Sequence, residues 1–257
     1  MADLTDQATA ILLLTLRIVP TLGFSPPFTL FRIPAIVRVL LSIALATWLV
    51  AALPEATWQR DFRGQGLFLT AIGELTLGIA LALALQYAFA ALLTVGRALD
   101  IQAGFGLAVV VDPTTRSQMP LIGTFFAYAA AALFFTGGGP NDLLAIWSAS
   151  VADVPLGSAT IGGDLARLLA FLSTVFVAAC GLGGTIMLAL FLCDLAISFM
   201  SRTLPQMNVL LLGFQVKALV TLALLPVAIA TGGMMFIRLL RLALEAAPEI
   251  VMATGHG

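Results

Sequence analysis

Few residues in this chain are of a type that could do chemistry, and the most prominent is a single carboxylate, Glu74. It stands near the start of an apolar stretch that covers residues 67–96. A carboxylate inside lipid is expensive and usually faces protein or water. We therefore consider a proton-relay role for Glu74 and, as the more ordinary roles, a buried hydrogen bond between helices or an interfacial position. Gly73 and Gly78 on either side would let another helix approach closely.

The groups that enzymes use for covalent or metal chemistry are poorly placed. The only histidine, His256, is next to last in the chain, so a Ser-His or Cys-His pair has no support. Cys180 and Cys193 are 13 positions apart. That spacing is about 20 Å along a straight helix, too far for a disulfide, so we expect two buried small apolar residues. Because Asp100 and Asp112 are isolated acids, the sequence predicts no catalysis, no metal site and no cofactor.

The stretch of residues 102–113 is glycine-rich and apolar, and it ends in a turn at Asp112-Pro113. It lacks the Lys-Ser or Lys-Thr ending of a phosphate loop, which argues against nucleotide binding. Two interpretations remain open: a kinked, buried helix followed by a loop, or a flexible apolar loop that lines or closes a pore. In the second case, apolar side chains would exclude ions by dewetting a constriction.

These residues have to be positioned in lipid, because the composition is that of an integral membrane protein. Hydrophobic residues make up 61% of the 257 residues and charged residues 10%, against about 25% charged residues in soluble domains. Residues 168–193 contain no charged side chain, and a helix needs only about 20 apolar residues to cross a bilayer. The net charge of −1 leaves no general basic surface for nucleic acid.

The apolar segments predict an all-α membrane protein with about six spans. Helices are expected because lipid offers backbone groups no partner, and the alternation typical of barrel strands is absent. Pro20, Pro26 and Pro27 should kink or end the first span. Three shorter apolar pieces are interpreted as re-entrant, interfacial or buried in protein. The predicted spans are 8–28, 35–53, 67–96, 117–136, 166–193 and 218–237, and the shorter pieces are 98–111, 143–151 and 195–212.

The distribution of charge predicts an N-terminus outside the cytoplasm. The loops after the first, third and fifth spans carry arginine or lysine, whereas residues 137–164 hold three acids and no cation. Lysine and arginine are enriched in cytoplasmic loops, which places the first group of loops inside. Arg238 and Arg241 then fall on the outer side and favour the opposite orientation.

Several short motifs follow one another along nearly the whole chain: Gly73-Glu74 with Gly78, Gln102-Ala-Gly, Asp112-Pro113, Pro120, the turn Pro155-Leu-Gly157, and Arg202-Thr-Leu-Pro-Gln-Met-Asn208 with Gly213 and Lys217. Each motif alone is weak. Their order and spacing together resemble the flagellar biosynthesis protein FliR family, whose injectisome relatives belong to the type III secretion export apparatus. The Pro-Gln-Met-Asn run looks more flagellar than injectisome.

The resemblance implies a fold and a function that the composition alone does not give. A FliR-like chain is similar to a FliP-like part, here about residues 1–190, fused to a FliQ-like part, about residues 191–257, within one membrane-embedded domain. One such chain joins several copies of FliP and FliQ in a cone-shaped export gate, much of it lifted out of the bilayer plane. The implied function is a channel-forming subunit that passes unfolded flagellar proteins across the membrane, with no enzymatic activity.

The resemblance also implies a location and partners. We expect a multi-pass protein of the bacterial inner (cytoplasmic) membrane within the flagellar basal body. Its expected partners are FliP and FliQ homologues, FlhB and FlhA homologues, the MS ring and proximal rod, exported unfolded flagellar proteins and membrane lipid, but no nucleic acid. The alternatives are an injectisome export-gate subunit, a proton-coupled secondary transporter that uses Glu74, and a membrane enzyme.

In the family, the loop that matches residues 104–121 acts as a plug in the closed channel. Its glycines would give mobility, its apolar side chains would seal the pore, and Met119 would be a soft contact. Glu74 and Gln102 are the expected intramembrane polar residues. The implied plug residues are Gly104, Phe105, Gly106, Leu107, Val109, Val110, Val111, Asp112, Pro113 and Met119. The implied partner contacts are Arg202, Pro205, Gln206, Asn208 and Lys217.

Overall fold

The computed structural model describes residues 2–59, 66–105, 120–158, 165–203 and 209–251. Within these ranges the regular structure is entirely helical, which confirms the predicted all-α fold class. The helices are α1 (Ala2–Phe24), α2 (Pro26–Leu30), α3 (Ala35–Ala52), α4 (Leu67–Ala103), α6 (Leu121–Thr136), α7 (Gly139–Asp153), α8 (Leu165–Thr203) and α9 (Val209–Val251).

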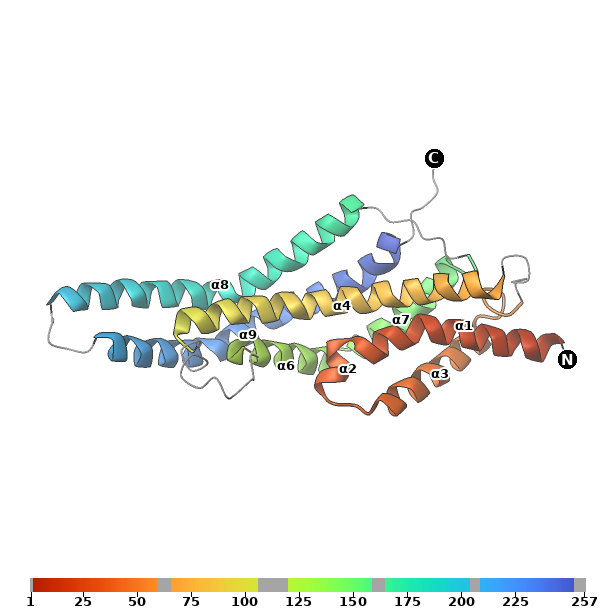
Figure 1. Ribbon diagram of the computed structural model, residues 1–257, viewed down its shortest axis with the longest axis horizontal. Coiled ribbons are helices and arrows are strands. Elements are labelled where there is room, and N and C mark those ends of the chain that lie inside the picture. Colours follow the sequence, from red (N-terminus) through yellow and green to blue (C-terminus); the bar gives the residue numbers. More distant parts are fainter. Residues whose placement is uncertain (1, 60–65, 106–119, 159–164, 204–208, 252–257) are drawn as a thin grey trace.

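Figure 1 shows an elongated bundle in which α4 runs along the long axis. Helix α4 packs against α1, α6, α8 and α9, and α1 also packs against α3. Helices α8 and α9 pack against each other and extend beyond α4 at the end opposite the N-terminus (Figure 1). The central position of α4 explains why its buried residues cover most of its length.

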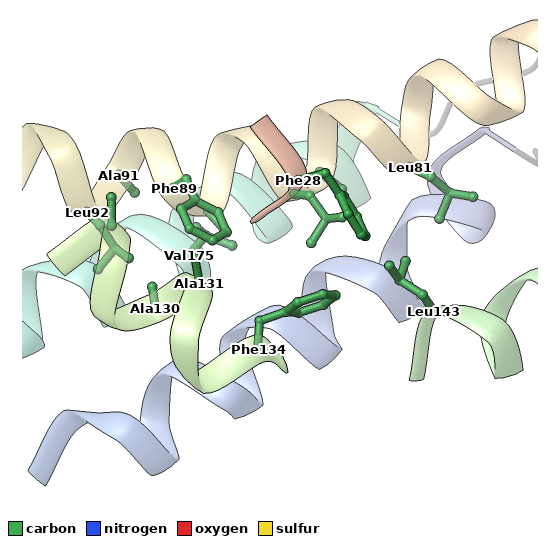
Figure 2. Close-up of a cluster of buried hydrophobic side chains, with 14 of the residues drawn as sticks. Phe28, Leu81, Phe89, Ala91, Leu92, Ala130, Ala131, Phe134, Leu143 and Val175 are labelled. Carbon is green, nitrogen blue, oxygen red and sulfur yellow. The ribbon is translucent and has the colours of Figure 1, made fainter. Parts of the chain in front are cut away.

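The hydrophobic core lies where α4 meets its neighbours. Figure 2 shows Phe89 and Leu92 of α4 in a cluster with Ala131 and Phe134 of α6 and with Val175 of α8. All five side chains are buried. Small alanines alternate with large aromatic rings in this cluster, so the helices can approach while the rings fill the space between them.

Helices α4 and α6 cross in close backbone contact. A Cβ atom added to Gly96 would overlap the Cα of Gly123 on the other helix. A Cβ on Gly123 would lie 3.0 Å from the carbonyl oxygen of Leu93. Two backbones can approach this closely only where neither residue has a side chain, so these glycines fix the crossing point.

Five of the described helices are long and apolar enough to cross a membrane, and a sixth span results if α6 and α7 are counted as one. The axes of α6 and α7 differ by 69° across a short break, where Gly138 has a positive φ of 87°. The number of spans agrees with the predicted six, and Ala35–Ala52 reproduces the second predicted span to within one residue. The chain is therefore a multi-pass membrane protein.

The prediction that residues 98–111 and 195–212 form separate short pieces was wrong in part. Helix α4 continues without interruption to Ala103, and α8 continues to Thr203. The charged residues that suggested loops at these points have partners inside the protein. Asp100 accepts a hydrogen bond from the backbone of Ile122, and Asp194 pairs with Lys217. Residues 143–151 lie within α7, the second half of the bent pair.

The first predicted span ends as expected, but its first proline does not break it. Pro20 lies inside α1, which continues to Phe24. Ser25 separates α1 from α2, and Pro26 and Pro27 occupy the first turn of α2. Proline is tolerated in a first turn because the backbone N–H groups there have no helical partner.

Candidate functional site

The most strongly constrained polar group in the bundle is an ion pair between α1 and α4. Arg17 Nε donates a hydrogen bond of 2.6 Å to Glu74 Oε2, and both side chains are fully buried. An isolated charge at such a depth would cost several kcal/mol, and the partner charge offsets that cost only when the geometry is good. The pair therefore lets two apolar helices carry one charge each into the interior.

The remaining hydrogen-bonding groups of the pair are satisfied by the end of α7 and the turn that follows it. Arg17 Nη1 donates to the carbonyl oxygen of Ser150 at 2.9 Å and to its Oγ at 3.1 Å. Both terminal nitrogens of Arg17 also donate to the carbonyl oxygen of Val154 at 3.1 Å. The N–H of Gly157 donates to Glu74 Oε1 at 3.2 Å. A cation at a helix C-terminus is favourable because it lies at the negative end of the helix dipole.

Two glycines make this arrangement possible. A Cβ on Gly78 would overlap the carbonyl oxygen of Arg17, so α1 and α4 touch backbone to backbone one turn after Glu74. Gly157 has a φ of 84°, a conformation that favours glycine, and it presents its N–H to the carboxylate. We call Arg17, Glu74, Ser150, Val154 and Gly157 the ion-pair node.

The node bears on the role of Glu74 in the fold. Each carboxylate oxygen accepts a hydrogen bond, one from Arg17 and one from Gly157, so the buried interaction between helices agrees with the geometry. Sequence reasoning missed Arg17 as the partner. The available signal was a lone arginine inside the first apolar span, together with the Pro155-Leu-Gly157 turn.

A second polar group lies where α4 ends. Gln102 Nε2 donates to the carbonyl oxygen of Met187 on α8 at 3.3 Å. Lys217 Nζ on α9 donates to the carbonyl oxygen of Gln102 at 3.4 Å and forms an ion pair with Asp194 on α8. The last turn of α4 is therefore fixed to both α8 and α9. Lys217 was expected to contact a partner, and its described contacts are within the chain.

Two of the implied plug residues fall within the described ranges and pack on α9. Gly104 ends α4 with a φ of 90°, and a Cβ there would lie 2.9 Å from the ring of Phe214. The rings of Phe105 and Phe214 meet edge to face with centroids 6.2 Å apart, which is a favourable aromatic geometry. The other predicted plug residues lie outside the described residues: Gly106, Leu107, Val109, Val110, Val111, Asp112, Pro113 and Met119.

The other implied partner contacts are only partly described. Arg202 is exposed in the last turn of α8, whereas Pro205, Gln206 and Asn208 lie outside the described residues. The prediction that both cysteines are buried was wrong, because Cys180 is exposed and Cys193 is half-buried on α8.

Asp100 was not singled out from the sequence as a site residue, and the structure gives it a structural role. Its side chain is 6% exposed, and its Oδ1 accepts the N–H of Ile122 at 3.1 Å. Ile122 is in the first turn of α6, whose N-cap position is Pro120 without a capping side chain. Asp100, which lies on α4, therefore caps the N-terminus of α6. An acidic group is favourable there because the N–H groups of the first turn lack helical partners and the helix dipole is positive at that end.

No group of three potential metal ligands occurs within the part of the chain that the structure describes. The bundle of long apolar helices, with the buried ion pair between α1 and α4, defines a multi-pass membrane protein without a recognisable catalytic constellation in those residues.

Comparison with known proteins then identifies the family. Residues 8–243 match the bacterial export proteins, family 1, and the chain belongs to this family. It is a structural component of an export apparatus and not an enzyme.

The chain is 29% identical over 236 residues to the flagellar biosynthetic protein FliR of Bacillus subtilis (strain 168), covering 90% of each chain. It is 27% identical over 216 residues to FliR of Escherichia coli (strain K12), covering 82% of this chain and 80% of the relative. It is 26% identical over 158 residues to the surface presentation of antigens protein SpaR of Shigella flexneri, covering 62% of this chain and 61% of the relative.

Proposed function

We propose that the protein is the channel-forming subunit of a flagellar type III export gate and passes unfolded flagellar proteins across the inner membrane. The observation that carries this proposal is the match to flagellar FliR proteins along nearly the whole chain, which reaches 90% of both chains for the Bacillus subtilis relative. The match to SpaR covers 62% of the chain, and it supports an injectisome export gate as the second candidate.

The proposed plug is the loop over residues 104–121. Its first two residues support the proposal by their position, because Gly104 and Phe105 lie at the end of α4 and pack on Phe214. The loop supplies four further large apolar side chains between residues 107 and 111. Apolar side chains that line a constriction exclude ions by dewetting, so such a loop can seal a channel until a substrate arrives.

The proposed partners are homologues of FliP, FliQ, FlhB and FlhA, together with the MS ring and proximal rod of the basal body. Large apolar side chains exposed on α3 and α8 offer surfaces that membrane lipid or partner helices can cover. We also propose that Arg202, Pro205, Gln206 and Asn208 contact partners. The exposed apolar residues of α3 include Ile36, Val37, Leu40 and Trp48, and those of α8 include Leu188, Phe191, Leu192 and Phe199.

The proposed division into a FliP-like part, about residues 1–190, and a FliQ-like part, about residues 191–257, puts the boundary within α8. The packing of α8 against α9 supports this boundary, because the FliQ-like part then consists of two packed segments, the end of α8 and the whole of α9.

The plug is tested by ion leakage in cells that carry the chain and its partners. Glycine in place of Leu107, Val109, Val110 and Val111 removes the apolar seal while leaving the loop its length. We expect a rise in conductance of at least tenfold at unchanged assembly of the complex. A matched variant with isoleucine at the same four positions keeps the apolar character, adds one methylene at each valine position, and should stay closed. Wild-type conductance in a fully assembled glycine variant would contradict the plug.

The proton-coupled transporter receives less support. A carrier has to release and rebind its proton, whereas both oxygens of Glu74 are buried and hydrogen-bonded to Arg17 and Gly157. The function proposed for the chain therefore assigns Glu74 to the fold and not to transport.

A further inference from the structure

The axes of α6 and α7 differ by 69°. The residues at the bend do not by themselves explain how this angle is maintained. The connection consists of Gly137 and Gly138, and Gly138 has a positive φ of 87°. Glycine allows that conformation. Pro140 lies in the first turn of α7, and a proline there excludes one continuous helix, because its ring would clash with the preceding turn and it has no N–H to donate. These residues explain the break, whereas contacts elsewhere must hold α7 at its angle to α6.

One ion pair and one set of hydrogen bonds hold α7 to other helices, one near each of its ends. At the first turn, Asp142 pairs with Arg241 of α9 at 2.9 Å, with side chains 30% and 53% exposed. Exposed pairs of this kind contribute about 0–1 kcal/mol. At the last turn, the fully buried Arg17 binds Ser150 and Val154. The buried contact is the one with the larger consequence, because a buried charge that loses its partners costs several kcal/mol.

The hydrogen bonds of Arg17 are distributed unevenly between its two neighbours. Only Nε binds Glu74, whereas both terminal nitrogens bind the end of α7. Glu74 in turn uses its second oxygen to bind Gly157, in the turn after α7. By backbone proximity α7 packs against α6 and α9, so the node supplies a hydrogen-bonded connection from α7 to α1 and α4. Most of the node is therefore directed at α7.

We propose that Arg17 and Glu74 are positioning residues that fix the end of α7 and thereby hold α6 and α7 in their bent arrangement. The guanidinium group supplies the planar fork that reaches two backbone carbonyl groups at once. The carboxylate orients that fork and binds the following turn. This role does not require that the chain acts as an export gate.

Arg17→Lys separates this role from simple neutralisation of charge. A lysine keeps the positive charge for Glu74, but its point charge cannot reproduce the two-pronged contact with Ser150 and Val154. The matched control is Arg241→Lys, the same substitution in the exposed pair at the other end of α7.

The measurement is amide hydrogen exchange of the purified, membrane-inserted protein. The reporter is the turn at residues 155–157, where Leu156 donates to the carbonyl oxygen of Ala56 at 3.1 Å without touching the substituted side chains. The reference is the α4–α6 crossing, which would also respond to a general loss of stability. We expect Arg17→Lys to accelerate exchange at the turn at least tenfold, with the reference unchanged and no change in Arg241→Lys.

Two results would overturn the proposal. One is an Arg17→Lys protein whose turn exchanges within twofold of the original rate. The other is equal acceleration at the turn and at the reference. If Arg17→Lys does not accumulate, the double variant Arg17→Leu with Glu74→Leu decides, because it leaves no unpaired buried charge. It should accumulate and show the same local acceleration, and original exchange rates at the turn would refute a positioning role.

Discussion

Arg17 and Glu74 show what a sequence reveals about a buried charge and what it leaves hidden. Glu74 could be recognised because a carboxylate in an apolar stretch is costly. Its partner could not, because the two residues are 57 positions apart and only the packing of α1 on α4 brings them together. Their contacts with Ser150 and Gly157 were less predictable still, since these use a backbone carbonyl, which every residue type offers, and a backbone N–H, which every type except proline offers.

At the residue scale, removing one member of the ion pair should destabilise the protein strongly. Glu74→Leu leaves the guanidinium of Arg17 buried without its counter-charge, and such changes cost about 3–5 kcal/mol. Glu74→Gln keeps an oxygen for Gly157 and the side-chain volume, so its loss should be smaller. Thermal unfolding in detergent measures both variants. A Glu74→Leu protein as stable as the original would show that the pair contributes nothing.

At the scale of helices, apolar length predicted the elements well and their ends less well. Residues 35–53 were predicted and Ala35–Ala52 was found. Helices α4 and α8 proved longer than predicted because charged residues at their ends were interpreted as loops. Asp100 and Asp194 find partners on α6 and α9, and a helix can continue through a charge that has a partner. Hydropathy alone contains no information on such a partner.

The α4–α6 crossing allows a sharp test at this scale. Gly96→Ala places a methyl group on the Cα of Gly123, so the helices must separate, at a cost of about 1–3 kcal/mol. Gly184→Ala on α8 is the matched control, because a Cβ there meets nothing within 4 Å. Alanine is the better helix former by about 1 kcal/mol, so the control should be as stable as the original or more stable. Unfolding curves in which both variants behave alike would contradict the proposed crossing.

At the scale of the whole molecule, composition established a membrane protein, and the order of short motifs indicated its family. The match over residues 8–243 confirmed that family. The break between α6 and α7 agrees with the predicted end of a span at residue 136 and the separate piece at 143–151. The angle between the two helices could not be predicted, because hydropathy does not depend on it. The residues that hold this angle, on our account, are Arg17 and Glu74, far from the bend in sequence.

The central claim is that this chain is one subunit of a larger export gate, and native mass spectrometry tests it most directly. The chain would be co-expressed with the FliP and FliQ homologues of its source, purified in detergent and weighed as an intact complex. We expect a hetero-oligomer that contains a single copy of this chain with several copies of both partners. A stable monomer or homodimer that binds neither partner would contradict the claim.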